Sequence, residues 1–250
     1  MKKNPASFIL LCCVTGSFLS GCAGQKYEHA SPAPDAGFIP HPELQTNRAD
    51  LPFQKAWVKP SFDKANYREL IVAPVNTQYM LQMDWWQQTN LRSMEGQFQR
   101  DVQELAQYMR NSFIKAFRED PNRRFKVINS PAGGTLQLEM ALIEVVPSKP
   151  VLNALAYAAP VYGTGTAASV MSPRTVAFEA RLRDAQTSEI VATFADRERQ
   201  DAGPIDLTRL TWYEPARDII DEWAAQLVQI ANRKPGEAVT DPIPITLKPW

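Results

Sequence analysis

The chain has 250 residues, of which 44% are hydrophobic and 22% are charged, and its 27 lysine and arginine residues balance its 27 aspartate and glutamate residues. This length is sufficient for one domain with a substantial hydrophobic core. The even charge balance gives no electrostatic basis for binding nucleic acid, so no nucleic-acid partner is expected.

The N-terminus has the layout of a bacterial secretory signal. Lys2 and Lys3 precede a run without charge from Phe8 to Leu19, and this run is shorter than the about 20 apolar residues of a membrane-spanning helix. The sequence Leu19-Ser20-Gly21-Cys22 then resembles the lipobox of bacterial lipoproteins. The resemblance implies that residues 1–21 are removed and that Cys22 carries a diacylglycerol on its sulfur and an acyl chain on its amino group.

An anchor of this kind would hold the protein on a membrane. Each buried methylene contributes about 0.8 kcal/mol, so three acyl chains make attachment effectively permanent. Ala23 follows Cys22, whereas an aspartate at that position tends to retain the Gram-negative lipoproteins that this chain resembles in the inner membrane. The resemblance therefore implies the periplasmic face of the outer membrane, with the membrane itself as one partner through the lipid.

The placement of cysteine and histidine limits the chemistry that the chain can perform. Cys12, Cys13 and Cys22 all lie in the signal or at its cleavage site, so no thiol remains for a disulfide, a nucleophile or a zinc site. His29 and His41 lie in a proline-rich segment after the anchor, where catalysis or metal binding is not expected. We predict no enzyme activity, no catalytic residue, no metal, and no cofactor other than the lipid on Cys22.

Composition divides the chain into four parts. We predict a signal peptide at 1–21, a lipidated proline-rich tether at 22–60, an α+β periplasmic domain at 61–236, and an extended tail at 237–250. Proline-rich segments favour extended structure, and the tether contains Pro32, Pro34, Pro40, Pro42, Pro52 and Pro60. Apolar residues interrupt it at 38–39 and 57–58, so part of the tether is expected to lie on the surface of the domain.

The first half of the domain shows three periodic segments. A continuous β-branched run from Glu69 to Val75 predicts a buried strand. Apolar residues at steps of mostly three or four then predict a long amphipathic helix from Met94 to Arg118. A second strand is predicted from Arg124 to Ile128, after Asp120-Pro121-Asn122 has ended the helix.

The second half adds strands and another helix. Residues 135–146 predict a strand with a bulge near Leu142, because the apolar phase shifts there. Residues 175–200 predict an antiparallel hairpin with one buried side. A second amphipathic helix is predicted from Trp212 to Arg233. These elements predict a two-layer α+β sandwich, in which two long helices lie on one face of a mostly antiparallel sheet of about five strands.

Several stretches resemble a family of uncharacterised Gram-negative lipoproteins, a domain of unknown function. Besides the lipobox they are "AGFIPHPEL", "WVKPSFDKANYRELIVAPV", "ALIEVVPSKP" and "FEARLRDAQTSEIVATFADRE". Members often have Thr-Gly-Glu at the hairpin turn, whereas this chain has Thr187-Ser188-Glu189; glycine would favour a positive φ there. The resemblance brings no known catalytic residue. The order of elements is also similar, at the level of fold, to periplasmic lipoproteins that assist envelope machines.

Two segments are candidates for contact with a partner. Residues 150–173 contain no charged residue and include Tyr157 and Tyr162. They are long enough for a membrane-inserted hairpin in an oligomeric ring, although a connection packed on the domain or on a partner is the commoner case. Trp85 and Trp86 are adjacent, so one of them is a candidate for an exposed contact with a partner or a glycan. The alternative is a loop aromatic folded over the edge of the sheet.

Three functions fit these observations. The leading hypothesis is a non-enzymatic, membrane-anchored periplasmic module that binds another envelope component, expected to be a protein. The first alternative is a ring-forming or pore-forming lipoprotein that uses residues 150–173. The second alternative is a small-ligand carrier or hydrolase, which requires a concave pocket with convergent polar groups.

Overall fold

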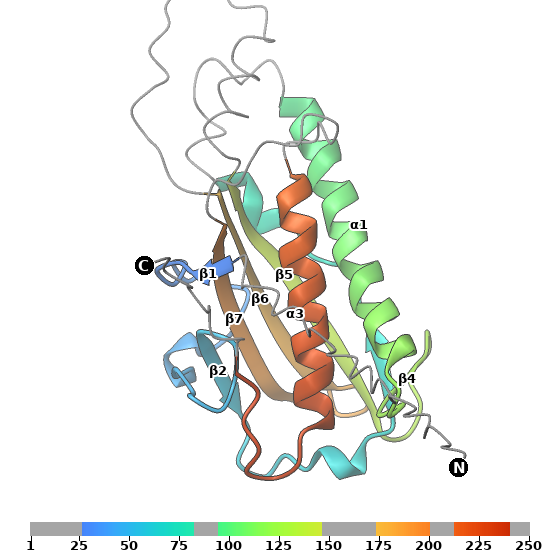
Figure 1. The fold of residues 1–250 in the computed structure, drawn as a ribbon. Coiled ribbons are helices and arrows are strands. Elements are labelled where there is room, and N and C mark those ends of the chain that lie inside the picture. Colours follow the sequence, from blue (N-terminus) through green and yellow to red (C-terminus); the bar gives the residue numbers. More distant parts are fainter. Residues whose placement is uncertain (1–26, 83–94, 147–173, 201–212, 241–250) are drawn as a thin grey trace, which may run out of the picture.

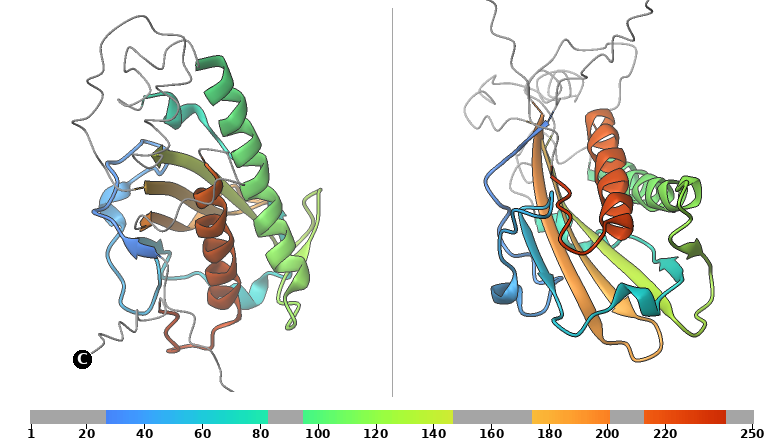
Figure 2. Two further views of the ribbon diagram at one scale, coloured as in Figure 1. Left: turned by 45° about the horizontal axis from the view of Figure 1, so that its top comes forward. Right: turned by 60° about the horizontal axis from the view of Figure 1, so that its bottom comes forward.

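The computed structural model describes residues 27–82, 95–146, 174–200 and 213–240. Two long helices, α1 and α3, lie side by side on one face of a single sheet (Figures 1 and 2). In chain order the elements are β1 (Tyr27–His29), η1 (Pro42–Leu44), β2 (Lys55–Val58), η2 (Lys64–Asn66), β3 (Glu69–Val72), η3 (Gln78–Gln82), α1 (Glu95–Glu119), β4 (Lys126–Val127), β5 (Thr135–Val146), β6 (Arg174–Asp184), β7 (Ile190–Gln200) and α3 (Glu214–Asn232).

The sheet has seven strands rather than the predicted five or so, in the order β1-β7-β6-β5-β3-β4, with β2 also pairing with β7. It is mixed, because β3 runs parallel to both β4 and β5. Strand β3 is followed by α1 before the chain returns to the sheet, and such a helical crossover is the connection that parallel neighbours require. The α+β class and the one-sided helices are as predicted. The strand number is corrected, and the sheet is mixed rather than purely antiparallel, because the two pairings of β3 are parallel.

The predicted bulge and hairpin are confirmed. Strands β6 and β7 are antiparallel, with Ala180 opposite Phe194. Strand β5 pairs with β6, and their register shifts between Leu142 and Glu144, where the apolar phase of the sequence changes. An extra residue of this kind lets the apolar side chains on both sides of the shift remain on buried faces.

The turn of the hairpin has a residue with a positive φ, the conformation that favours glycine. Ser188 has a φ of 61°, in the left-handed region. Its N–H donates to the carbonyl oxygen of Asp184 at 2.9 Å, and Asp184 Oδ1 accepts from the backbone N–H groups of Gln186 and Thr187, both at 2.8 Å. These bonds hold a side-chain-bearing residue in a conformation that costs about 1–2 kcal/mol for an L-residue.

Ser188→Gly is expected to raise the free energy of unfolding by about 0.5–1 kcal/mol, because relief of the left-handed strain exceeds the extra freedom of glycine in the unfolded chain. Urea unfolding followed by circular dichroism measures the change. Gln186→Gly is the matched control, since Gln186 in the same turn does not have a positive φ; it is expected to be neutral or destabilising. A lower stability of Ser188→Gly would contradict the prediction.

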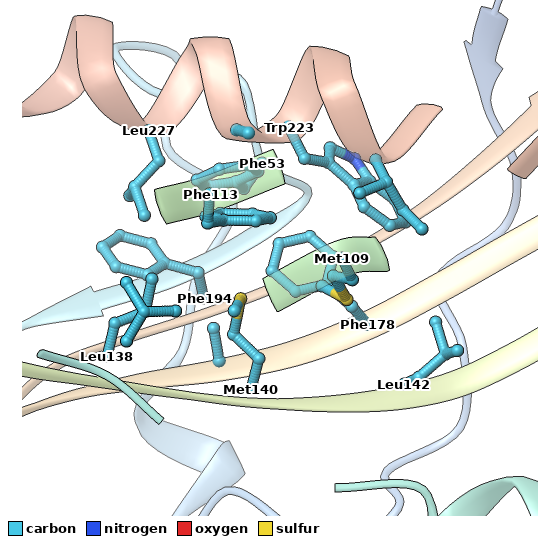
Figure 3. Close-up of a cluster of buried hydrophobic side chains, with 14 of the residues drawn as sticks. Phe53, Met109, Phe113, Leu138, Met140, Leu142, Phe178, Phe194, Trp223 and Leu227 are labelled. Carbon is cyan, nitrogen blue, oxygen red and sulfur yellow. The ribbon is translucent and has the colours of Figure 1, made fainter. Parts of the chain in front are cut away.

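The main core lies between the two helices and the sheet. Predicted face residues of α1, including Phe98, Leu105, Met109 and Phe113, are at most 1% exposed. They meet the inner face of the sheet and α3, where Trp223 is fully buried (Figure 3). Within the described residues, none of the helices combines the length and the apolar composition needed to span a membrane.

Residues 27–60 contribute to the folded unit, although the sequence predicts residues 22–60 as a tether. Strands β1 and β2 both pair with β7. Leu51 and Phe53 are buried in the main core, and Phe38 and Ile39 form a second, smaller cluster. The folded part therefore begins before residue 61, because short strands at a sheet edge gain their hydrogen bonds from β7 and need no periodic pattern of their own.

The outer face of the hairpin is also partly covered. The hairpin is therefore buried fully on one face and partly on the other, whereas the sequence predicts burial of one face only. Glu179 on this face accepts hydrogen bonds from the backbone N–H groups of Ala36 and Ile39, at 3.1 and 3.2 Å. Burial raises the pKa of the Glu179 carboxyl above its ordinary value, and the two N–H donors partly oppose this rise. The Arg181 guanidinium lies over the ring of Phe38 at 4.4 Å, which further holds the segment against the sheet.

Candidate functional site: a cavity between the helices and the sheet

A cavity of about 490 Å³ lies where the C-terminal ends of α1 and α3 meet the sheet. Its walls are apolar side chains from both layers. The sheet contributes Leu70, Leu136, Leu182, Ala192 and Phe194, and the helices contribute Phe117, Leu227, Ile230 and Ala231. Phe62 and Phe125, from the connections that follow β2 and α1, also line the cavity, as do Leu51, Val58 and Pro235.

The volume is that of a ligand site rather than of a packing defect. Protein interiors are close-packed, with few voids larger than a water molecule, whereas ligand cavities occupy about 300–1,000 Å³. A water molecule takes about 30 Å³ in the liquid, and a methylene group is of similar size. The cavity of about 490 Å³ is therefore large enough for an acyl-like chain.

One end of the cavity is lined by charged side chains, which we call the rim: Arg48, Asp50, Asp63, Lys64, Arg233 and Lys234. Arg48 binds Asp50 through two hydrogen bonds, from Nε at 2.9 Å and from Nη2 at 2.7 Å. Arg233 Nη1 donates to the same carboxylate at 2.7 Å. These donors, Arg48 first, hold the pKa of the Asp50 carboxyl well below its usual range, against the opposing effect of burial.

Lys64 lies in a part of the rim that is rich in positive charge. Its ammonium group donates to the carbonyl oxygen of Ala231 at 2.9 Å and also to that of Arg233, at the C-terminal end of α3. Burial lowers the pKa of Lys64, and the positive charges of Arg124 and Arg233 lower it further. The rim contains four basic and two acidic side chains, so it favours an anionic group at the mouth of an apolar cavity.

The residues predicted as sites lie outside the described part of the chain. These are Cys22, Trp85, Trp86, Tyr157 and Tyr162, so the structure neither brings them together nor separates them. The sequence does not predict the cavity, because its walls come from five strands and two helices, and their apolar residues follow the ordinary pattern of core positions. Among the described residues, a group with metal-ligand spacing is formed by His29, Asp196 and Glu198, and none of the three lines the cavity.

Comparison with solved structures gives matches at low identity and with TM-scores below 0.5. The PelC dodecamer from Paraburkholderia phytofirmans is 13% identical, with 69% of this chain and 94% of that chain covered and a TM-score of 0.36. A protein of the family DUF330 from Xanthomonas campestris is 11% identical, with 70% and 92% covered and a TM-score of 0.40. A comparison with curated proteins gives no match. The family model described as "Protein of unknown function (DUF3313)" matches residues 35–227, and the chain therefore belongs to this family, a domain of unknown function as its motifs predict.

Proposed function

We propose that the protein is a membrane-anchored module that binds an amphiphile, with an acyl-like chain in the cavity and an anionic head group at the rim. The observation that carries the proposal is the combination of an apolar cavity of about 490 Å³ with a rim in which basic side chains outnumber acidic ones. Lipid-like ligands have this division into a long apolar part and a compact charged part. Arginine and lysine side chains suit the charged part, since they donate several hydrogen bonds to carboxylate or phosphate oxygens.

The rim favours binding over hydrolysis. A general base needs a pKa near the working pH, whereas Asp50 is strongly acidic because Arg48 and Arg233 hold its ionised form. The described lining contains no serine, threonine, cysteine or histidine that could act as a nucleophile or base. Of the functions predicted from the sequence, we therefore favour the small-ligand carrier over the hydrolase.

The lipid anchor is part of the same proposal. A diacylglyceryl group on Cys22 at the periplasmic face of the outer membrane would keep the cavity within reach of the amphiphiles of that membrane. Two other hypotheses, an envelope protein partner and a pore, depend on Trp85, Trp86 and residues 150–173. These segments lie outside the described residues. Those two hypotheses remain predictions from the sequence, and the cavity is the described feature that points to a ligand.

The test is direct binding with a matched pair of ligands. The full chain, with all three cysteines replaced by serine so that no acyl chain is attached, is titrated with palmitic acid and with hexadecanol, which have the same chain length. We expect the acid to bind at least about tenfold more tightly, since a hydrogen bond to a charged group contributes about 1.5–3 kcal/mol. Native mass spectrometry of the purified protein is expected to show a co-purified amphiphile.

Three results would contradict the proposal. If neither ligand bound saturably, the cavity would not be an amphiphile site. If the acid and the alcohol bound with equal affinity, the rim would not recognise the charged head group. Binding of the acid that persists at full strength in the double variant Lys64→Met, Arg233→Met would show that the charge is recognised elsewhere.

A further inference from the structure

A second site lies where β1 meets β7, away from the cavity. His29 is directly opposite Glu198 in the antiparallel register of these strands. Side chains opposite each other in a ladder share one face of the sheet, and residues two apart along a strand do so as well. Asp196 is two residues before Glu198 on β7, so the pairing places an imidazole and two carboxylates together on one face.

The distances between these three side chains match those between ligands of one metal ion. His29 Nδ1 lies 3.2 Å from Asp196 Oδ1 and 3.0 Å from Glu198 Oε1, and one ligand atom from each residue lies within 4.8 Å of the others. Zinc bonds to nitrogen and oxygen of about 2.0–2.2 Å in tetrahedral geometry separate neighbouring ligand atoms by roughly 3.4 Å. The two carboxylates are 0% and 6% exposed, whereas His29 is 37% exposed and lets solvent reach the group.

The Asp196 carboxylate is held in place by N–H donors from outside the group. Its Oδ1 accepts from the backbone N–H of Gln54 at 3.2 Å, and its Oδ2 accepts from the indole Nε1–H of Trp223 at 2.8 Å. In metal sites, hydrogen-bond donors that contact a ligating carboxylate hold it in the orientation that the metal ion needs. The carboxylate is therefore fixed between a backbone amide in the connection after η1 and the buried tryptophan of α3, with little freedom to turn away from His29.

We propose that His29, Asp196 and Glu198 bind a divalent transition-metal ion of the Zn²⁺ class. Two buried carboxylates close together repel each other, and a divalent cation removes that repulsion. A single imidazolium Nδ1–H donates only one hydrogen yet lies within reach of two carboxylate oxygens, whereas a metal ion can bond to both. Because β1 lies just after the lipidation position Cys22, the ion would fasten the membrane-proximal strand to the domain.

This site departs from the expectation that no metal is bound. That expectation depended on His29 lying in a tether, and the pairing of β1 with β7 places it in the sheet instead. Imidazole nitrogen and carboxylate oxygen together suit Zn²⁺ and related ions, whereas Mg²⁺ and Ca²⁺ prefer oxygen ligands alone. Mg²⁺ and Ca²⁺ at equal concentration are therefore expected not to displace Zn²⁺.

Isothermal titration with Zn²⁺ tests the site in the full chain with its three cysteines replaced by serine, which removes thiol ligands. We expect one Zn²⁺ per chain and a thermal midpoint that rises with Zn²⁺ concentration. His29→Ala and Glu198→Gln each remove a ligand atom, so each is expected to weaken binding by at least about 10–100-fold, the loss typical of removing only an outer-shell partner. His41→Ala is the matched control, because His41 is the other histidine of the chain and lies in an exposed position outside the site.

Either of two outcomes would overturn the inference. The first is the absence of Zn²⁺ binding, or a Zn²⁺ affinity that His29→Ala leaves unchanged. The second is an ion pair alone, in which His29→Ala lowers stability but Zn²⁺ changes the thermal midpoint of neither protein. Loss of folding in Glu198→Gln, detected by circular dichroism, would leave His29→Ala as the deciding variant, since His29 is partly exposed at the sheet edge.

Discussion

Replacement of Trp223 by alanine is expected to lower the free energy of unfolding by about 3–5 kcal/mol, the range for removing a buried aromatic side chain. Trp223 is fully buried, and its ring lies 4.3 Å from that of Phe178, centroid to centroid (Figure 3). The substitution leaves a cavity between α3 and the sheet and also removes the indole N–H from the buried carboxylate of Asp196. Urea denaturation measures the loss.

A conservative variant separates the two causes. Trp223→Phe keeps most of the apolar volume but removes the N–H donor, so it is expected to cost about 1–3 kcal/mol, the penalty for a buried acceptor that has lost its partner. Leu44→Ala is the surface control, because Leu44 is 49% exposed; its effect is expected to stay within about 0.5 kcal/mol. If Trp223→Ala cost no more than Leu44→Ala, the assigned core would be wrong.

Ala231→Phe is expected to reduce the affinity for palmitic acid by roughly 60-fold. Ala231 lies on α3 and lines the cavity, so a phenyl ring at this position would displace roughly three methylene groups of a bound chain. At about 0.8 kcal/mol for each, the loss is about 2.4 kcal/mol. Titration with fatty acids of decreasing length measures the effect, which is expected to diminish as the ligand becomes short enough to avoid the ring.

The control for this variant is Ala65→Phe. Ala65 is exposed in η2, next to the rim residue Lys64, and does not line the cavity. The same increase in side-chain size at this position is expected to leave affinity within about twofold of the original, as surface substitutions change energies by about 0.5 kcal/mol or less. A folded Ala231→Phe protein that binds palmitic acid as tightly as Ala65→Phe would place the ligand outside the cavity.

The sequence predicted the regular elements well where the pattern is local. Helix α1 spans Glu95–Glu119 against a prediction of Met94 to Arg118, and α3 spans Glu214–Asn232 within the predicted 212–233. Their apolar residues recur with the period of a helix, and burial of one face is a property of the segment itself. The hairpin and the bulge after Leu142 were equally predictable, because alternation and its interruption can be read within a dozen residues.

The N-terminal strands were not predictable in the same way. Strands β1 and β2 have three and four residues, too short to establish an alternation, and they lie among prolines that favour extended tethers. Their stability comes from β7, which is more than 100 residues away along the chain and supplies the ladder of hydrogen bonds. The proposed metal site depends on the same pairing, and the sequence predicts His29 in a tether, where metal binding is not expected.

What the sequence determined by itself is the set of local structures: two one-faced helices, a hairpin, a bulged strand, and the lipobox that predicts an anchor at Cys22. Only the tertiary structure decided the strand order, the cavity with its basic rim, and the grouping of His29 with Asp196 and Glu198. The physical reason is the separation of the partners. Lys64 reaches a carbonyl 167 residues away, and Ile39 donates to a carboxylate 140 residues away. Contacts of that range arise from packing two layers together, and they leave no periodic signal in the sequence.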